Sequence, residues 1–174
     1  MQSFVQHLSK YAAYHRDKRN VATHYIGIPM IVAGVATLLS RPAFMHVDGA
    51  AISPALIVVA ITALFYLALD IRFGVAMSVF LAACLWLGQM LAVQPTSIWL
   101  SWGIGLFVVG WVFQFVGHYY EGKKPAFVDD IVGLAIGPIF VAAELAFELG
   151  LRKDVQDAVE ARVGPTFIRQ AKVA

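Results

Sequence analysis

Histidines near both ends of a long apolar region are the residues whose type and spacing best suit chemistry. His15 and His24 lie nine residues apart, and Gln114, His118 and Glu121 follow one another at intervals of four and three. Intervals of three and four align side chains along one stripe of a helix. Neutral imidazole binds iron, zinc, copper or nickel, and an added carboxylate gives the donors typical of non-haem Fe(II) sites. The pattern therefore predicts a transition-metal site.

A shared site needs a bend between the first two histidines. On one straight helix, nine residues would separate His15 from His24 by about 13.5 Å and turn them to nearly opposite faces. Asn20 or Thr23 could cap a new helix after such a bend, because both side chains accept hydrogen bonds from free backbone N–H groups. Asn20 would then share a face with His24.

The rest of the composition indicates lipid as the solvent. The 174 residues are 60% hydrophobic and only 14% charged, with a mean hydropathy of +0.73, unlike an ordinary soluble domain. Between Val21 and Val116 the charged residues are Arg41, Asp48, Asp70 and Arg72. The net charge of +2 is too small and dispersed to indicate nucleic acid as a partner.

Four apolar stretches are long enough to cross a bilayer of about 30 Å. They run roughly over Val21–Ser40, Ile52–Leu69, Phe73–Val93 and Ile98–His118. An even number of crossings brings the start of the first stretch and the end of the fourth to one side, which places His24 near His118. The basic residues that flank both ends predict that this side is cytoplasmic.

The remaining segments complete an all-α, polytopic membrane bundle that we expect to be a single domain over residues 1–174. A fifth apolar stretch, Phe127–Leu149, contains Gly137 and Pro138, so we expect a broken, re-entrant or interfacial segment. Amphipathic helices are predicted at the termini, over Gln2–Lys18 and Leu151–Val163.

Each candidate residue also has a structural interpretation. A histidine at a membrane edge is commonly an interfacial hydrogen-bonding residue. Glu121 could be a solvated surface charge, and Arg19 and Lys123 could be cytoplasmic anchors. Asp129 and Asp130 most simply cap the next helix.

The two histidine segments together resemble one family. The matching residues are Tyr14, His15, Asn20, His24, Gly27, Pro29, Gln114, Phe115, Gly117, His118, Glu121, Pro125 and Ala126. They resemble the fungal 2-hydroxy fatty acid dioxygenases and their bacterial relatives, and the apolar segments between them match in number and order. The resemblance implies an Fe(II) membrane enzyme that shortens a 2-hydroxy fatty acid by one carbon with molecular oxygen.

The same resemblance implies roles for individual residues. His15, His24 and His118 would bind iron, with Glu121 as a fourth ligand or a supporting group. Asn20 and Gln114 would orient the ligands. The basic residues that could hold the substrate carboxylate are Arg16, Arg19, Lys123 and Lys124. The acyl tail would remain in membrane lipid, in a bacterial inner membrane with the site at its cytoplasmic face.

Two other functions fit the same residues. A membrane electron carrier could bind haem through His24 and His118 as axial ligands. A small lipid transporter or scaffold could instead line a path with intramembrane polar groups, although these groups gather at one surface here.

Overall fold

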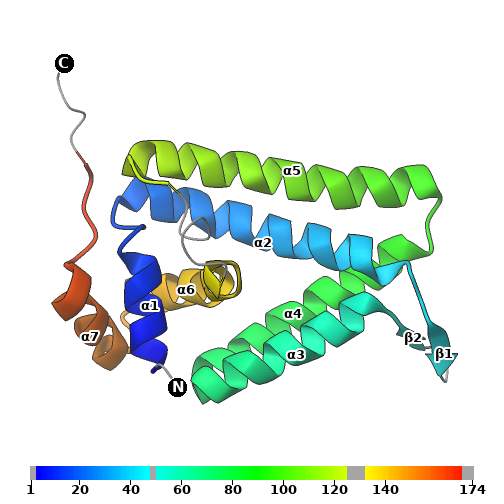
Figure 1. Ribbon diagram of the computed structural model, residues 1–174, viewed down its shortest axis with the longest axis horizontal. Helices are drawn as coiled ribbons and strands as arrows, with labels where there is room; N and C mark the ends of the chain where they lie inside the picture. Colours follow the sequence, from blue (N-terminus) through cyan, green and yellow to red (C-terminus); the bar gives the residue numbers. More distant parts are fainter. Residues whose placement is uncertain (1–2, 48–49, 125–131, 170–174) are drawn as a thin grey trace. The chain divides into compact units, whose positions relative to one another are not determined.

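The computed structural model describes residues 3–47, 50–124 and 132–169, and these residues are mostly helical (Figure 1). The elements in chain order are α1 (Phe4–Ala12), α2 (Lys18–Ser40), β1 (Met45–Val47), β2 (Ala50–Ile52), α3 (Pro54–Leu69), α4 (Ile71–Ala92), α5 (Thr96–Glu121), α6 (Val132–Glu148) and α7 (Lys153–Val163). The predicted all-α class is confirmed, and the described strands are one antiparallel pair.

The chain forms two compact units. The first comprises residues 1–28 and 112–174, and the second comprises residues 29–111. Helices α2 and α5 each run through both units. All the candidate site residues that the structure describes lie in the first unit.

Within the part of the chain that the structure describes, three helices are long and apolar enough to cross a membrane by length and composition, namely α2, α4 and α5. The most apolar 18-residue window of α4 has a mean hydropathy of 1.9, yet only 22% of it is buried inside the protein. Large side chains such as Leu64 and Val79 are each 67% exposed. Apolar surface of this extent indicates association with lipid.

The second unit holds its helices together by close backbone approach. A Cβ on Gly34 of α2 would lie 2.8 Å from the backbone nitrogen of Phe107 and 2.9 Å from the carbonyl oxygen of Gly103, both in α5. Small residues at such crossings are typical of membrane helices. The indole of Trp99 donates to the carbonyl of Thr37 at 2.8 Å, which joins the two helices again.

Helix α3 is shorter than the predicted second span. Ser53 caps its start and Pro54 follows at the first helical position, where a missing N–H is tolerated. Its 16 residues fall short of the span length that α2, α4 and α5 reach. Asp70 then ends α3 and caps α4 by accepting from the N–H groups of Arg72 and Phe73, both at 3.0 Å. Four full spans are therefore not established, and α3 packs against α4 as a tight helical hairpin.

The fifth apolar segment breaks later than predicted. Helix α6 continues through Pro138, and the chain bends by 110° between α6 and α7. The two helices together have the character of a broken span or re-entrant loop. A Cβ on Gly137 would lie 2.9 Å from the Tyr11 hydroxyl, so α6 packs closely against α1 beside this proline. The predicted caps Asp129 and Asp130 lie outside the described residues.

The predicted terminal amphipathic helices are present with altered ends. In α1, Ser3 and Gln6 form a reciprocal capping box, and the stripe of Phe4, Leu8 and Tyr11 is buried. In α7, Val155 and Val159 are buried, and Gly164 ends the helix at a φ of 79° that glycine adopts readily.

Candidate metal centre

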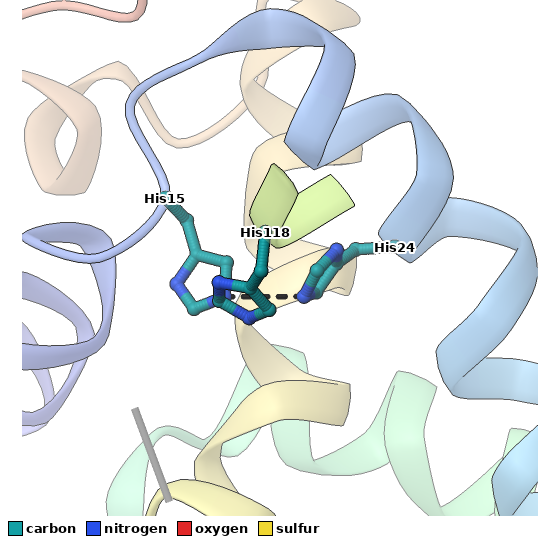
Figure 2. A group of neighbouring side chains, drawn as sticks. All are labelled: His15, His24 and His118. Atoms are coloured by element: carbon teal, nitrogen blue, oxygen red, sulfur yellow. Dashed lines mark hydrogen bonds between the residues drawn. The ribbon is translucent and has the colours of Figure 1, made fainter. Parts of the chain in front are cut away.

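Three histidine rings from three segments meet in the first unit, and they point toward one another (Figure 2). His15 lies in the loop between α1 and α2, His24 in α2, and His118 in the last turn of α5. One potential ligand atom from each lies within 4.8 Å of the others, and all three residues are buried. The predicted meeting of His24 with His118 is confirmed, with ring centroids 5.2 Å apart.

Hydrogen bonds to backbone carbonyls fix the tautomers of two of these rings. His15 Nδ1 lies 2.7 Å from the carbonyl oxygen of Tyr11, and His24 Nδ1 lies 2.9 Å from that of Asn20. A carbonyl only accepts, so each Nδ1 carries the proton and each neutral ring keeps a lone pair on Nε2. Backbone carbonyls often orient metal-binding histidines in this way.

The lone pairs on the two Nε2 atoms face each other, and a cation between them would remove their repulsion. His15 Nε2 and His24 Nε2 are 3.1 Å apart. Imidazole nitrogens about 2.0–2.1 Å from one ion would lie roughly 2.9–3.4 Å apart, from right-angled to tetrahedral geometry. Protonating His15 instead is unfavourable, because burial, and next the neighbouring His24, lower its pKa well below the ordinary 6.5. The donors therefore fit a transition metal.

Aromatic side chains keep water away from the His15 ring. Tyr11 stacks on it with centroids 4.1 Å apart and an interplanar angle of 3°. Phe140 of α6 lies 5.4 Å from the same ring and 4.9 Å from that of Tyr11. This enclosure explains why burial is the main cause of the lowered His15 pKa.

The predicted bend between His15 and His24 is confirmed, but its cap is Asp17 rather than Asn20 or Thr23. Helix α2 begins at Lys18, and Asp17 Oδ1 accepts from the backbone N–H of Arg19 at 2.9 Å. Arg19 also donates twice to this carboxylate, which lowers the Asp17 pKa to about 2. Asn20 lies in the first turn of α2, where its carbonyl holds His24.

Glu121 links the end of α5 to the start of α2 beside the three histidine rings. Its Oε2 accepts from the Asp17 backbone N–H at 2.8 Å and from Asn20 Nδ2 at 3.1 Å. Its side chain is fully buried, and Oε1 lies 3.7 Å from a guanidinium nitrogen of Arg169. Among the described residues, the cluster within 4.8 Å contains the three histidines without Glu121. These contacts favour a supporting role, and metal ligation by Glu121 stays a prediction.

The other predicted polar residues surround this core. Gln114 is 95% buried, one helical turn before His118, and within the described part of the chain its Nε2 has no hydrogen-bond partner. Arg19 is engaged by Asp17. The exposed Lys123 donates to the carbonyl of Ala13 at 2.8 Å.

Gly117 lets α5 approach α2 at the site. A Cβ at this position would overlap Thr23 Oγ1 and Asn20 Oδ1 and would lie 3.1 Å from His24 Nδ1. The hydroxyl of Thr23 donates to the Asn20 carbonyl at 2.7 Å, so this side chain is itself held in place.

Comparison with known proteins identifies the family. The family model described as 2-hydroxy-palmitic acid dioxygenase Mpo1-like matches residues 1–149, which include all three clustered histidines. The chain is also similar to the 2-hydroxy-palmitic acid dioxygenase MPO1 of Saccharomyces cerevisiae (strain ATCC 204508 / S288c). The two are 30% identical over 155 residues, which cover 88% of this chain and 85% of the yeast protein. The chain belongs to the Mpo1-like family. No solved structure matches it.

One ion pair of this Mpo1-like protein could not be located from sequence spacing. The Arg16 guanidinium donates to Glu144 Oε1 of α6 at 2.9 Å, and both side chains are largely buried. Arg16 Nε also donates to the carbonyls of Ala12 and His15, at 2.9 and 3.1 Å. The only available signal was an acidic residue inside an apolar helix, which usually has a charged partner.

Proposed function

We propose that this chain is an Fe(II)-dependent 2-hydroxy fatty acid dioxygenase of fatty acid alpha-oxidation. In balanced form, the 2-hydroxy acid and one molecule of oxygen give the acid one carbon shorter, carbon dioxide and water. The observation that carries the proposal is the pair of Nε2 atoms 3.1 Å apart on two rings whose Nδ1 atoms face backbone carbonyls, with His118 beside them. The name of the yeast relative supports the substrate class.

His15, His24 and His118 would hold the iron, which supplies Lewis acidity and electrons for the reaction with oxygen. The carbonyls of Tyr11 and Asn20 keep the His15 and His24 rings in the tautomer that presents Nε2 to a metal. Burial keeps His15 neutral and therefore competent as a ligand at neutral pH. Three protein ligands leave coordination positions for substrate and oxygen.

Gln114 is the residue that we assign to orienting a substrate oxygen. Its buried Nε2 is a donor with no acceptor among the described residues, and a buried unpaired donor is costly. A carboxylate or hydroxyl oxygen of the substrate would satisfy it. Arg19 and Lys123 keep their proposed role in attracting the carboxylate, because the Arg19 side chain is 40% exposed and Lys123 is exposed.

The apolar helices α2, α4 and α5 would keep the protein in a membrane, so that the acyl tail of the substrate remains in lipid while its polar end reaches the histidines. We place the site at the cytoplasmic face of a bacterial inner membrane. Basic residues near the start of α2 and the end of α5 support this orientation through the positive-inside tendency.

A haem-binding electron carrier is not favoured by the arrangement. The ring centroids of His24 and His118, the two ligands that haem would need, lie 5.2 Å apart. The ring of His15 lies 4.6 Å from that of His24 and 4.9 Å from that of His118, so a third imidazole lies beside the pair. A transporter or scaffold is not favoured either, because the buried polar groups of the site form one compact cluster rather than a path.

The test is metal analysis of protein purified without oxygen, followed by incubation with 2-hydroxypalmitate and oxygen. We expect bound iron without an intense Soret band, and oxygen-dependent formation of the shortened acid. His24→Ala and His118→Ala should each lose iron and activity while still entering membranes. His7→Ala is the matched control, because His7 lies in α1 outside the cluster. Full iron and full activity in both site variants would reject the proposal.

A further inference from the structure

The loop that carries His15 is held by the C-terminal end of the described chain. We call residues 164–169 the C-terminal strap. The backbone N–H of Phe167 donates to the Arg16 carbonyl, and the N–H of Lys18 donates to the Phe167 carbonyl, both at 2.9 Å. These bonds form a parallel bridge between Asp17 and Phe167. The strap thus adds a short strand to the extended segment that follows His15.

Side chains fasten the strap at both of its ends. Arg16 donates to the carbonyl of Gly164 at 2.9 Å. At the other end, the Arg169 N–H donates to Asp17 Oδ2 at 2.8 Å, and Arg19 donates to the Arg169 carbonyl at the same distance. The strap, which contains no regular helix or sheet, is therefore hydrogen-bonded to the segment after His15 at three positions, Gly164, Phe167 and Arg169.

Arg169 also supplies charge where two carboxylates are buried together. The side chains of Asp17 and Glu121 are both 0% exposed, and the Asp17 backbone N–H donates to Glu121. Arg169 lies 3.7 Å from Glu121 Oε1 through its guanidinium, and it holds Asp17 through its backbone. Buried carboxylates need cationic partners, because desolvation otherwise favours their protonation. Glu121 is three residues after His118, and Asp17 is two residues after His15.

We propose that the C-terminal strap holds the His15 loop in its metal-binding position, and that Arg169 is a positioning residue that acts through Asp17 and Glu121. The inference deepens the proposed function and rests on its metal site. The strap lies beyond residues 1–149, which the family model matches and which contain the three histidines.

Two matched pairs of variants test the strap. Phe167→Pro removes the backbone N–H that bonds Arg16. Phe167→Ala keeps this N–H and removes a side chain that is 46% exposed, whose ring makes only a distant contact, 6.0 Å, with the Arg169 guanidinium. Arg169→Ala removes the guanidinium beside Glu121, whereas Arg169→Lys keeps a positive charge. Each full-length variant would be purified in detergent and titrated with Co²⁺, whose visible spectrum reports the ligand geometry. Hydrogen exchange would be followed for the segment over residues 13–20.

We expect Phe167→Pro and Arg169→Ala to weaken Co²⁺ binding by roughly tenfold or more, the usual effect of losing a group that orients metal ligands. Their spectra should change, and hydrogen exchange over residues 13–20 should become faster. Phe167→Ala should match the wild type, and Arg169→Lys should recover most of the affinity. Unchanged affinity and spectrum in both Phe167→Pro and Arg169→Ala would overturn the inference.

The same experiment separates the two proposals. If the wild type binds no metal, the proposed function fails, while the exchange measurement still decides whether the strap holds the loop. Unchanged exchange in Phe167→Pro would then reject the strap. If Phe167→Pro does not fold, the Arg169→Ala and Arg169→Lys pair decides, because both variants keep every backbone bond of the strap.

Discussion

Replacing Gly117 by alanine tests whether close approach of α5 to α2 sets the metal site. The added Cβ would overlap Thr23 Oγ1 and Asn20 Oδ1 and would lie 3.1 Å from His24 Nδ1. Neither neighbour can move freely, since Thr23 donates to the Asn20 carbonyl and Asn20 donates to Glu121. The helices must therefore separate, or these hydrogen bonds must break.

Gly105→Ala is the matched control on the same helix, because a Cβ there meets no atom within 4 Å. Both substitutions gain roughly 1 kcal/mol of helix propensity. Only Gly117→Ala also carries the overpacking penalty of about 1–3 kcal/mol. The difference between the two variants therefore isolates that penalty, which corresponds to a gap in Tm of about 2–4 °C for each kcal/mol.

The assay pairs thermal unfolding in detergent with a metal titration. We expect Gly105→Ala to unfold at or above the wild-type temperature with unchanged metal affinity. Gly117→Ala should unfold at a lower temperature than this control and bind metal about tenfold or more weakly, because the displaced Asn20 carbonyl orients His24. Equal stability and equal affinity in the two variants would refute the packing argument.

Three further outcomes follow from the same unit. Arg16→Ala should lower the free energy of unfolding by about 3–5 kcal/mol in chemical denaturation, because it leaves Glu144 buried without its partner. The double variant, Arg16→Ala with Glu144→Ala, should recover part of this loss. Glu121→Ala should cost about 1–3 kcal/mol for each of the two donors that it leaves buried. A loss no larger than that of Asp157→Ala, which removes an exposed carboxylate, would contradict this role. Because the His15 pKa is lowered in the folded protein, the unfolded chain binds a proton below pH 6.5 that the folded chain does not. The free energy of unfolding of the metal-free protein should therefore be highest above pH 6.5. It should fall as the pH drops below 6.5, by at most about 1.4 kcal/mol per pH unit. His15→Gln should flatten this dependence of the Tm on pH, and an unchanged slope would show that another group is responsible.

The meeting of the three histidines could be predicted because it depends on where the long apolar runs lie along the sequence. Runs of apolar residues fix the approximate helices, and their reversal brings the end of α5 to the start of α2. The need for a bend after His15 follows from helix geometry alone. These arguments use only spacing and hydropathy, which a single sequence contains.

The predictions of the α2 cap and of a break at Pro138 were wrong because both features depend on contacts with residues distant in the chain. Asp17 rather than Asn20 caps α2, and its carboxylate is held by the backbone of Arg169, 152 residues away. Pro138 does not break α6, where Gly137 packs against Tyr11 of α1 and tertiary contact outweighs the local propensity. Local patterns do not contain these two contacts. Helix α3 is different, because Ser53 and Pro54 are local start signals, and they begin the helix later than its apolar run begins.

The order of the ligands along the chain has a consequence for biosynthesis. His15 and His24 leave the ribosome before His118, which follows only after α2, α3 and α4 have been made, and the strap emerges after all three histidines. If α2 and α4 cross a bilayer, as their length and composition allow, they can insert before the imidazole cluster is complete. A nascent polypeptide that stops before residue 118 would lack one of the three imidazoles.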